Sequence, residues 1–191
     1  MQTRIYQHIR SHIEVFERVF LPMTADVERC AQLMCAVLQG GNKILVMGNG
    51  GSAADAQHLA AELVGRFLKN RAALPAIALT TDSSILTAVA NDFGYDQVFS
   101  RQVEALAQAG DLVIGISTSG NSPNVVKAID VARERGCRTV AFTGRDGGAM
   151  AQRVDLSLTV GVDETPRIQE VHLTIIHILC DLVEQELFGE D

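Results

Sequence analysis

The feature that most constrains the fold is a series of short apolar runs that alternate with longer helical stretches after Lys43. The runs are almost continuously apolar, as parallel strands are when both faces of their sheet are covered. Helical stretches near residues 53–68, 84–91, 97–108 and 122–135 separate them. The candidate strands are Ile44–Met47, Ala76–Leu79, Leu112–Ile116, Thr139–Phe142 and Leu156–Val160. This order predicts an α/β fold with a doubly wound, mostly parallel five-stranded sheet flanked by helices.

Two amphipathic helices are predicted before the sheet. Apolar residues recur at spacings of three and four from Ile5 to Phe20, and again from Val27 to Leu38, as the buried face of a helix requires. Pro22 should interrupt the helical track, and Thr24 should cap the second helix. Gly40-Gly41 should end that helix.

A long C-terminal helix is predicted over residues 165–187, after the last strand. The chain shows no internal repeat, low-complexity tract or linker, so residues 1–191 should form a single domain. The helices at both ends offer more apolar surface than one small sheet needs to cover it. We therefore expect an oligomer that forms through these helices.

The charge balance excludes some classes of partner. The chain has 16 basic and 23 acidic residues, a formal net charge of −7. Nucleic acids are bound mainly through clustered Lys and Arg, so no nucleic-acid partner is expected. A sugar-phosphate-sensing transcription factor would need a basic helix-turn-helix, and the acidic total and apolar first helices argue against one.

The lack of an apparent targeting signal and the cysteine usage favour a cytoplasmic protein with no membrane partner. No apolar run reaches the length of a membrane span, and Met1–Arg10 lacks the apolar core of a signal peptide. The cysteines form no C-x-x-C pair and lie in apolar stretches, which favours reduced, buried thiols. They are Cys30, Cys35, Cys137 and Cys180.

Two loops rich in glycine and hydroxyl groups follow predicted strands and open predicted helices. They are Gly48–Ala53 and Ser117–Pro123. In open α/β sheets, ligands bind at the carboxyl ends of the strands. Glycines let backbone N–H groups approach an anion, a helix N-terminus adds partial positive charge, and hydroxyls donate hydrogen bonds. Either loop alone also fits an ordinary helix cap, but the two together predict a site for a phosphate monoester.

The helix after the first loop carries a candidate metal pair. His58 and Glu62 are four residues apart, so they lie on one helix face and can share a metal ion. Arg66 continues the same stripe at the edge of the site. Such pairs are also common on solvent-exposed helices, and the position directly after a phosphate loop is what favours a functional reading.

The last helix carries Gln169, His172 and His177. His177 lies in the apolar run Ile175–Leu179, where a histidine is more often a core residue than a ligand. Gln169 and His177 are eight residues apart, roughly 12 Å along an ideal helix axis. They cannot easily hold one small ion from the same straight helix. Either a neighbouring chain supplies one of them, or one contacts the substrate first and the metal second.

Together these motifs resemble those of the phosphoheptose isomerases, within the sugar-isomerase (SIS) fold family. The resemblance runs from about residue 3 to residue 188 with similar motif spacing. The serine-rich loop alone marks only the fold family, whereas its combination with the histidines and Glu62 is specific. The motifs are Gly48–Ser52, Asp55–His58 with Glu62, Asn91-Asp92, Ser117–Ser122, Thr143–Gly148, and Arg167–Glu170 followed by His177.

The resemblance implies a homotetramer with sites at subunit contacts and one zinc ion (Zn²⁺) per subunit. It also implies conversion of sedoheptulose 7-phosphate to D-glycero-D-manno-heptose 7-phosphate, the first step towards ADP-heptose and the lipopolysaccharide core. The implied zinc ligands are His58, Glu62, Gln169 and His177. The implied substrate contacts are Asn49, Gly50, Gly51, Asp92, Ser117, Thr118, Ser119, Ser122 and Gln169. The candidate substrate site is completed by Ser52, Glu62, Arg66 and Asn91.

The residue types agree with aldose–ketose isomerisation. This reaction moves a proton between C1 and C2 of the sugar through an enediol. We predict Glu62 as the base and His177 as its acid–base partner. Zinc would polarise the carbonyl oxygen or only hold the open sugar chain in place.

The main alternative is a non-catalytic regulator. Such a protein, with the same fold, binds the bacterial replication initiator, and it resembles this chain in the loops and in Leu179–Leu182. A pure scaffold has no need of His58, Glu62 and His177 together, which favours an enzyme. An arabinose 5-phosphate isomerase is compatible with the fold alone, but the predicted ligand set favours a heptose.

Overall fold

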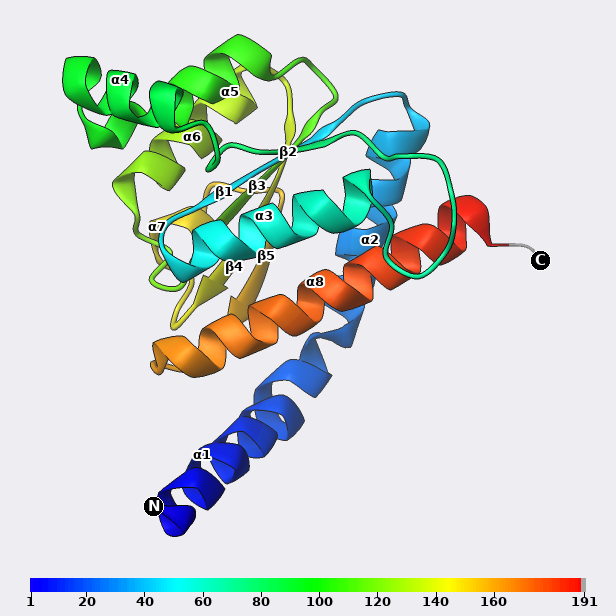
Figure 1. The fold of residues 1–191 in the computed structure, drawn as a ribbon, viewed down its shortest axis with the longest axis vertical. Helices are drawn as coiled ribbons and strands as arrows, with labels where there is room; N and C mark the ends of the chain where they lie inside the picture. Colours follow the sequence, from blue (N-terminus) through cyan, green and yellow to red (C-terminus); the bar gives the residue numbers. More distant parts are fainter. Residues whose placement is uncertain (190–191) are drawn as a thin grey trace.

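The computed structural model describes residues 1–189 and shows a parallel sheet between two layers of helices (Figure 1). All neighbouring strands pair in parallel, in the order β2-β1-β3-β4-β5. The predicted α/β fold with a five-stranded sheet is therefore confirmed. The strands are β1 (Ile44–Gly48), β2 (Ala76–Ala78), β3 (Leu112–Ser117), β4 (Arg138–Gly144) and β5 (Leu156–Val160).

The helices agree with the predicted ones to within a few residues at most ends. A short helix, α7, and the 3₁₀ turn η3 are additions that the apolar periodicity does not indicate. The regular helices are α1 (Gln2–Val15), α2 (Thr24–Gln39), α3 (Gly51–Val64), α4 (Ser83–Phe93), α5 (Ser100–Leu106), α6 (Pro123–Glu134), α7 (Gly148–Ala151) and α8 (Thr165–Phe188). The irregular turns are η1 (Phe16–Phe20), η2 (Leu21–Met23) and η3 (Tyr95–Gln97).

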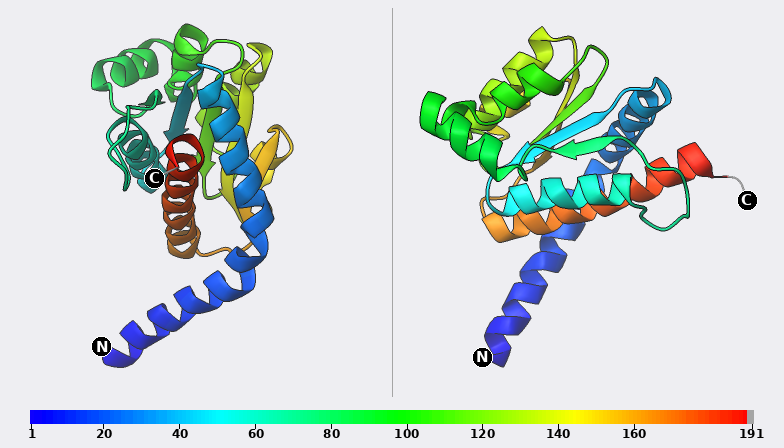
Figure 2. Two further views of the ribbon diagram at one scale, coloured as in Figure 1. Left: turned by 90° about the vertical axis from the view of Figure 1, so that its right-hand side faces the viewer. Right: turned by 45° about the horizontal axis from the view of Figure 1, so that its top comes forward.

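Two hydrophobic clusters, one on each face of the sheet, explain the continuous apolar runs. Successive side chains of a strand point to opposite faces. Ile44 and Val46 of β1 accordingly join a cluster with α2, α3 and α8, whereas Leu45 and Met47 join one with α5 and α6. Figure 2 shows these two helical layers on either side of the strands. All four cysteines are buried free thiols, as predicted.

The N-terminal region differs from its prediction around Pro22. The helical track does not stop there, because the π-helical turn η1 and the 3₁₀ turn η2 carry it from α1 into α2. Proline lacks an N–H and crowds the preceding turn, and a change of helical winding absorbs both effects. Thr24 is consequently not a cap: it is the first residue of α2, and its hydroxyl donates to the carbonyl of Leu21. Gly40-Gly41 does end α2, with Gly41 at a φ of 77°.

Helix α1 leaves the body of the protein and has no buried residue (Figures 1 and 2). Its apolar residues Ile5, Tyr6 and Ile9 are 58%, 63% and 53% exposed. Contacts near its C-terminus hold it to the start of α8, where His12 Nδ1 lies 2.8 Å from Glu170 Oε2. The expected oligomer, which would form through the terminal helices, requires an exposed apolar face of this kind. No helix within residues 1–189 is long and apolar enough to cross a membrane.

A buried carboxylate ties the segment after α3 to α8. Glu184 accepts hydrogen bonds of 2.8 Å from the backbone N–H groups of Phe67, Leu68 and Lys69. It also pairs with Arg71 Nε at 3.0 Å, and the two side chains are only 1% and 2% exposed. Arg71 in turn donates to the carbonyl of Glu62 at 2.9 Å. This network, the Glu184 network, closes the C-terminal end of α3.

The Glu184 network should contribute strongly to stability. Desolvation alone would raise the pKa of Glu184, but the N–H groups of Lys69, Phe67 and Leu68, together with Arg71, lower it below its ordinary value of 4.5. Glu184→Gln leaves Arg71 without its buried partner, a change that costs about 3–5 kcal/mol of unfolding free energy. Urea unfolding at neutral pH measures this loss. The exposed Glu186→Gln on the same helix, as control, should stay within about 0.5 kcal/mol of wild type.

Wild type and Glu184→Gln together also test how the unfolding free energy depends on pH. Because the folded pKa of Glu184 is depressed, its stabilising contribution is complete above the unfolded pKa near 4.5 and is lost as the pH falls through the lower folded value. The unfolding free energy of wild type should therefore drop more steeply below that pH than that of Glu184→Gln. Parallel curves for the two proteins would show that Glu184 carries no such linkage.

Candidate active site

The two loops singled out in the sequence follow β1 and β3, the two strands at which the connections change direction. Strand β1 lies between β2 and β3, and Gly48 at its carboxyl end is level with Ile116 near the end of β3. In an open parallel sheet, the crevice at this switch point is the usual place for a ligand. The predicted phosphate loops therefore lie where the topology itself places a binding site.

The first loop turns sharply into α3. Gly50 has a φ of 56°, in the left-handed region that favours glycine. A Cβ on Gly48 would lie 2.7 Å from the backbone of Ser52, so only glycine fits where the strand meets the helix. Ser52 is buried in the first turn of α3, and its N–H donates to the carbonyl of Asn49 at 3.0 Å. The remaining N–H groups of this turn form the helix N-terminus beside the loop.

Hydroxyl groups gather in the second loop. Ser117 Oγ lies 2.9 Å from Ser122 Oγ and 3.4 Å from Ser119 Oγ. The backbone N–H of Asn121 donates to Ser119 Oγ at 3.1 Å, and Pro123 begins α6 directly afterwards. Thr118 lies within the same turn. The structure thus brings these three serines together at the start of a helix.

The segment after β4 packs against the second loop, which the sequence did not indicate. A Cβ on Gly120 would overlap the carbonyl of Gly147, and the N–H of Met150 donates to the carbonyl of Gly120 at 3.0 Å. Arg145 in this segment has a φ of 58°, unusual for a residue other than glycine. Arg145 lines a surface cavity together with Ser119, and the carboxylates of Asp146 and Asp163 line the same cavity.

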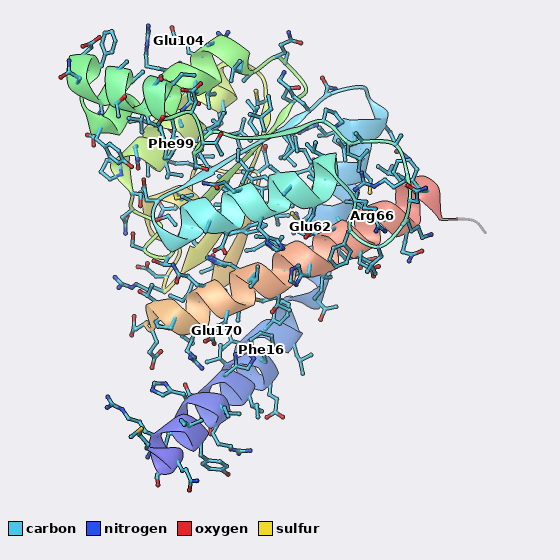
Figure 3. The ribbon with its side chains drawn as sticks, viewed as in Figure 1. Phe16, Glu62, Arg66, Phe99, Glu104 and Glu170 are labelled. Carbon is cyan, nitrogen blue, oxygen red and sulfur yellow. The ribbon has the colours of Figure 1, made fainter. Side chains whose placement is uncertain are left out.

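Three predicted catalytic and metal-binding side chains lie together between α3 and α8. His58 Nε2 is 2.9 Å from His177 Nε2 and 3.3 Å from Glu62 Oε1. The ring of Phe67 stacks on His177 with the centroids 5.7 Å apart. The side chains of His58 and Glu62 are 39% and 24% exposed, so the group opens to the surface. Figure 3 shows Glu62 between the two helices, with Arg66 beyond the end of α3.

Gln169 lies apart from that group and beside the first loop. Helices α3 and α8 run side by side in the same direction (Figure 1). Gln169 is near the start of α8, where its side-chain amide fills the space that a Cβ on Gly51 would need. His177, two turns further along, is level with His58. Within one chain, Gln169 therefore lies beside the first loop and away from His177, in agreement with the eight residues that separate the two on α8.

The donor set of this group fits zinc chemically. Zinc is bound by imidazole nitrogen and carboxylate oxygen, and two nitrogen ligands of a tetrahedral ion lie about 3.3 Å apart. The Nε2 atoms of His58 and His177 are somewhat closer than that, at 2.9 Å. Within residues 1–189, no group of three or more His, Cys, Asp and Glu side chains already has the arrangement of a metal centre. Zinc and its four expected ligands remain a prediction.

The candidate residues on α4, Asn91 and Asp92, make no hydrogen bond to either loop among the described residues. Asn91 Nδ2 donates to Asp92 Oδ1 at 2.8 Å, and both residues are exposed near the end of α4. Helix α4 has no buried residue, so it is weakly held to the sheet. Tyr95, just beyond it, connects to the site by donating from its hydroxyl to Asn49 Oδ1 at 3.3 Å.

Two further titratable groups are buried beside the site. Asp55, one turn before His58, has a buried Oδ2 without a hydrogen-bond partner among the described residues, and burial raises its pKa despite the opposing effect of His58. His172 is fully buried and lies 3.0 Å from the carbonyl of Thr143 through Nε2. Burial lowers the pKa of His172 to about 4, so this ring is neutral at pH 7. His172, and not His177, is the core histidine of α8.

Comparison with known proteins agrees with this geometry. Residues 7–144 match the SIS domain family. The chain is 58% identical to a phosphoheptose isomerase of Geotalea daltonii, covering 100% of this chain and 99% of that protein. It is 64% identical to one of Pelobacter propionicus, covering 94% of each. The solved phosphoheptose isomerase of Neisseria gonorrhoeae superposes with a TM-score of 0.92 at 46% identity, covering 96% of this chain and 98% of that one. The chain therefore belongs to the SIS domain family and, within it, to the phosphoheptose isomerases.

Proposed function

We propose that this protein is a sedoheptulose 7-phosphate isomerase that forms D-glycero-D-manno-heptose 7-phosphate. The observation that carries the proposal is that His58 lies within hydrogen-bond distance of both Glu62 and His177, on the helix that begins at the first loop. A pure binding protein gains nothing from holding a carboxylate and a second histidine against His58 at such a place. The similarity to phosphoheptose isomerases over the full chain supports the same activity.

In this proposal the phosphate is held by neutral donors. Ser117, Ser119 and Ser122 form one hydroxyl cluster at the start of α6, and the first loop presents the N-terminus of α3. Hydroxyl and backbone N–H groups bind a phosphate without the charged lysine of a nucleotide-triphosphate loop. The phosphate would anchor one end of an open-chain sugar, which leaves the other end to reach the group around Glu62.

Glu62 and His177 would divide the proton transfers. A base near C1 and C2 removes the carbon-bound proton and returns it to the neighbouring carbon, and an acid–base partner moves the proton between the two oxygens. Glu62 suits the first task and His177 the second. His58 Nε2 lies within hydrogen-bond distance of both Glu62 Oε1 and His177 Nε2, so without a metal it can donate to one of them, and with zinc bound the same nitrogen would be a ligand instead. The ring of Phe67 on His177 limits the access of water to that imidazole.

We also propose a zinc ion held by His58, Glu62 and His177, with Gln169 as the fourth ligand. When bound, it would polarise the sugar carbonyl or fix the open chain. Gln169 lies against Gly51 in its own chain, away from His58 and His177. The glutamine ligand would therefore come from a neighbouring subunit, or Gln169 would contact the substrate first and the metal second. The homotetramer that we propose would supply such a neighbour, and the exposed apolar face of α1 supports an assembly.

The expected setting is the cytoplasm, at the head of the route to ADP-heptose and the lipopolysaccharide core. The alternative is a non-catalytic regulator that binds the replication initiator. The two differ in one measurable property, since only the enzyme turns over sedoheptulose 7-phosphate.

Proton NMR with sedoheptulose 7-phosphate tests the activity and the role of Glu62 together. Wild type should produce the aldose signal. Glu62→Gln keeps the size but removes the base, so the rate should fall by at least about 100-fold. The variant should still bind the sugar phosphate, because both phosphate loops are untouched. Glu104→Gln, an exposed carboxylate far from the site in Figure 3, serves as control and should keep the wild-type rate.

His177→Ala should reduce the rate similarly, and the double variant with Glu62→Gln should be little slower than either single one, since groups that act as a unit are not additive. Near-normal turnover in purified Glu62→Gln would contradict the mechanism. A wild type without any turnover would favour the regulator.

Metal content tests the zinc proposal independently of activity. Wild type purified with zinc and dialysed should retain about one ion per chain, measured by mass spectrometry of the metal. His58→Ala and His177→Ala should each lower the zinc affinity by at least about tenfold, as the loss of a ligand-sphere group does. His8→Ala, on the exposed helix α1, is the matched control. Equal zinc content in all four proteins would argue against this site.

Light scattering tests the assembly. A homotetramer should give four times the chain mass of 20.6 kDa at micromolar concentration. Ile9→Asp places a charge on the apolar face of α1 and should shift the mass towards smaller species, because an interface excludes unpaired charge. A wild-type mass of 20.6 kDa under these conditions would contradict the tetramer.

A further inference from the structure

Asn124 connects the two phosphate loops through a pair of side-chain amides. Asn49 Nδ2 donates to Asn124 Oδ1, and Asn124 Nδ2 donates back to Asn49 Oδ1, both at 2.9 Å. Asn49 belongs to the first loop, and Asn124 is the second residue of α6, directly after the serine-rich loop. Asn124 is only 2% exposed, so it is out of reach of a ligand in the open crevice.

A backbone group fixes the direction of this pair. An amide pair alone would be equally well bonded if both side chains were flipped. The N–H of Val125, however, donates to Asn124 Oδ1 at 3.0 Å as well as to the carbonyl of Ser122 at 3.1 Å, and a backbone N–H can only donate. A flipped Asn124 would set its NH₂ group against this N–H, two donors facing each other, which favours the oxygen on this side. The orientation passes on to Asn49, whose Nδ2 must face that oxygen.

The hydrogen-bond inventory of Asn49 then leaves one free position. Its Oδ1 accepts from both Asn124 Nδ2 and the hydroxyl of Tyr95, which occupies the two lone pairs of an amide oxygen. One of the two Nδ2 hydrogens is used by Asn124. Among the hydrogen bonds of residues 1–189, the second Nδ2 hydrogen has no partner. Asn49 can therefore offer a ligand a donor and no acceptor.

We propose that Asn124 is a positioning residue that locks Asn49 as a hydrogen-bond donor to an oxygen of the sugar phosphate. This rests on the proposed function, in which Asn49 contacts the substrate. The lock acts in two ways. It prevents the amide flip that would present an oxygen to an anionic, oxygen-rich ligand. It also holds the first loop at a fixed distance from the serine cluster, so that both loops meet the same molecule without reordering.

A double-mutant cycle on KM tests this proposal with the sedoheptulose 7-phosphate assay. Asn124→Leu has a similar size and removes both amide contacts, and Asn49→Leu removes the donor itself. Each should raise KM about 5- to 30-fold, the effect of one lost hydrogen bond to a charged or strongly polar ligand, with a much smaller change in kcat. The double variant should have the KM of Asn49→Leu alone, because Asn124 acts only through Asn49.

A control separates this effect from general destabilisation. Thr139→Val likewise removes a buried hydrogen-bonding group, the hydroxyl that donates to Asp155 at the amino end of β4, away from the crevice. It should lower the melting temperature while KM stays at the wild-type value. If Asn124→Leu does not fold, the cycle is run with Asn124→Asp, which keeps the oxygen that accepts from Val125 and Asn49 but loses the donation to Asn49 Oδ1. Its smaller rise in KM should likewise vanish in the Asn49→Leu background.

Two results would each overturn the proposal. One is a wild-type KM in the folded Asn124→Leu protein, or in Asn124→Asp where that variant replaces it. The other is an effect on KM that multiplies with the effect of Asn49→Leu. Failure of the proposed function looks different, since wild type itself would then not convert sedoheptulose 7-phosphate.

Discussion

The contact between Glu184 and the segment after α3 sets how α8 lies against α3, and the candidate site depends on that register. Along the two parallel helices three contacts follow in order: Gln169 at Gly51, His177 at His58, and Glu184 at the backbone of Phe67–Lys69. A shift of one residue would move α8 by about 1.5 Å and turn its side chains by about 100°. The imidazole of His177 would then leave His58. A buried carboxylate with four donors resists such a shift, because any displacement leaves several of them unpaired.

A net charge of −7 shapes how such a protein can receive a phosphate. The loops at the switch point offer hydroxyl groups, glycine backbone and two helix N-termini, and these donors favour an anion locally without changing the overall charge. Asn124 adds to this arrangement by settling which end of Asn49 faces the crevice. Neutral donors of fixed direction are selective for oxygen acceptors, whereas a surface lysine would attract any anion.

Much of the fold followed from residue patterns. The five strands and the long helices have periodicities that depend only on local geometry, and their order leaves few topologies open. Pro22 shows where such reasoning fails, because a change of helical winding can absorb a proline that sequence rules treat as a stop. The short helix α7 was missed for a related reason, since four residues show no period. The loops were found because two such segments follow strands of one sheet, and the carboxyl ends of parallel strands are where ligands bind.

The sequence by itself determined the α/β class, the places of the two glycine- and serine-rich loops and the pairing of His58 with Glu62, because each rests on neighbours a few residues apart. Only the tertiary structure decided which histidine of α8 is a core residue. His172 and His177 lie in similarly apolar stretches, yet His172 packs against β4 and His177 faces His58. The tertiary structure also brought in Asn124, Tyr95, Arg71 and Glu184, none of which stands in a recognisable motif. Their importance comes from what lies opposite them, and that is set by the packing of helices on a sheet rather than by local sequence.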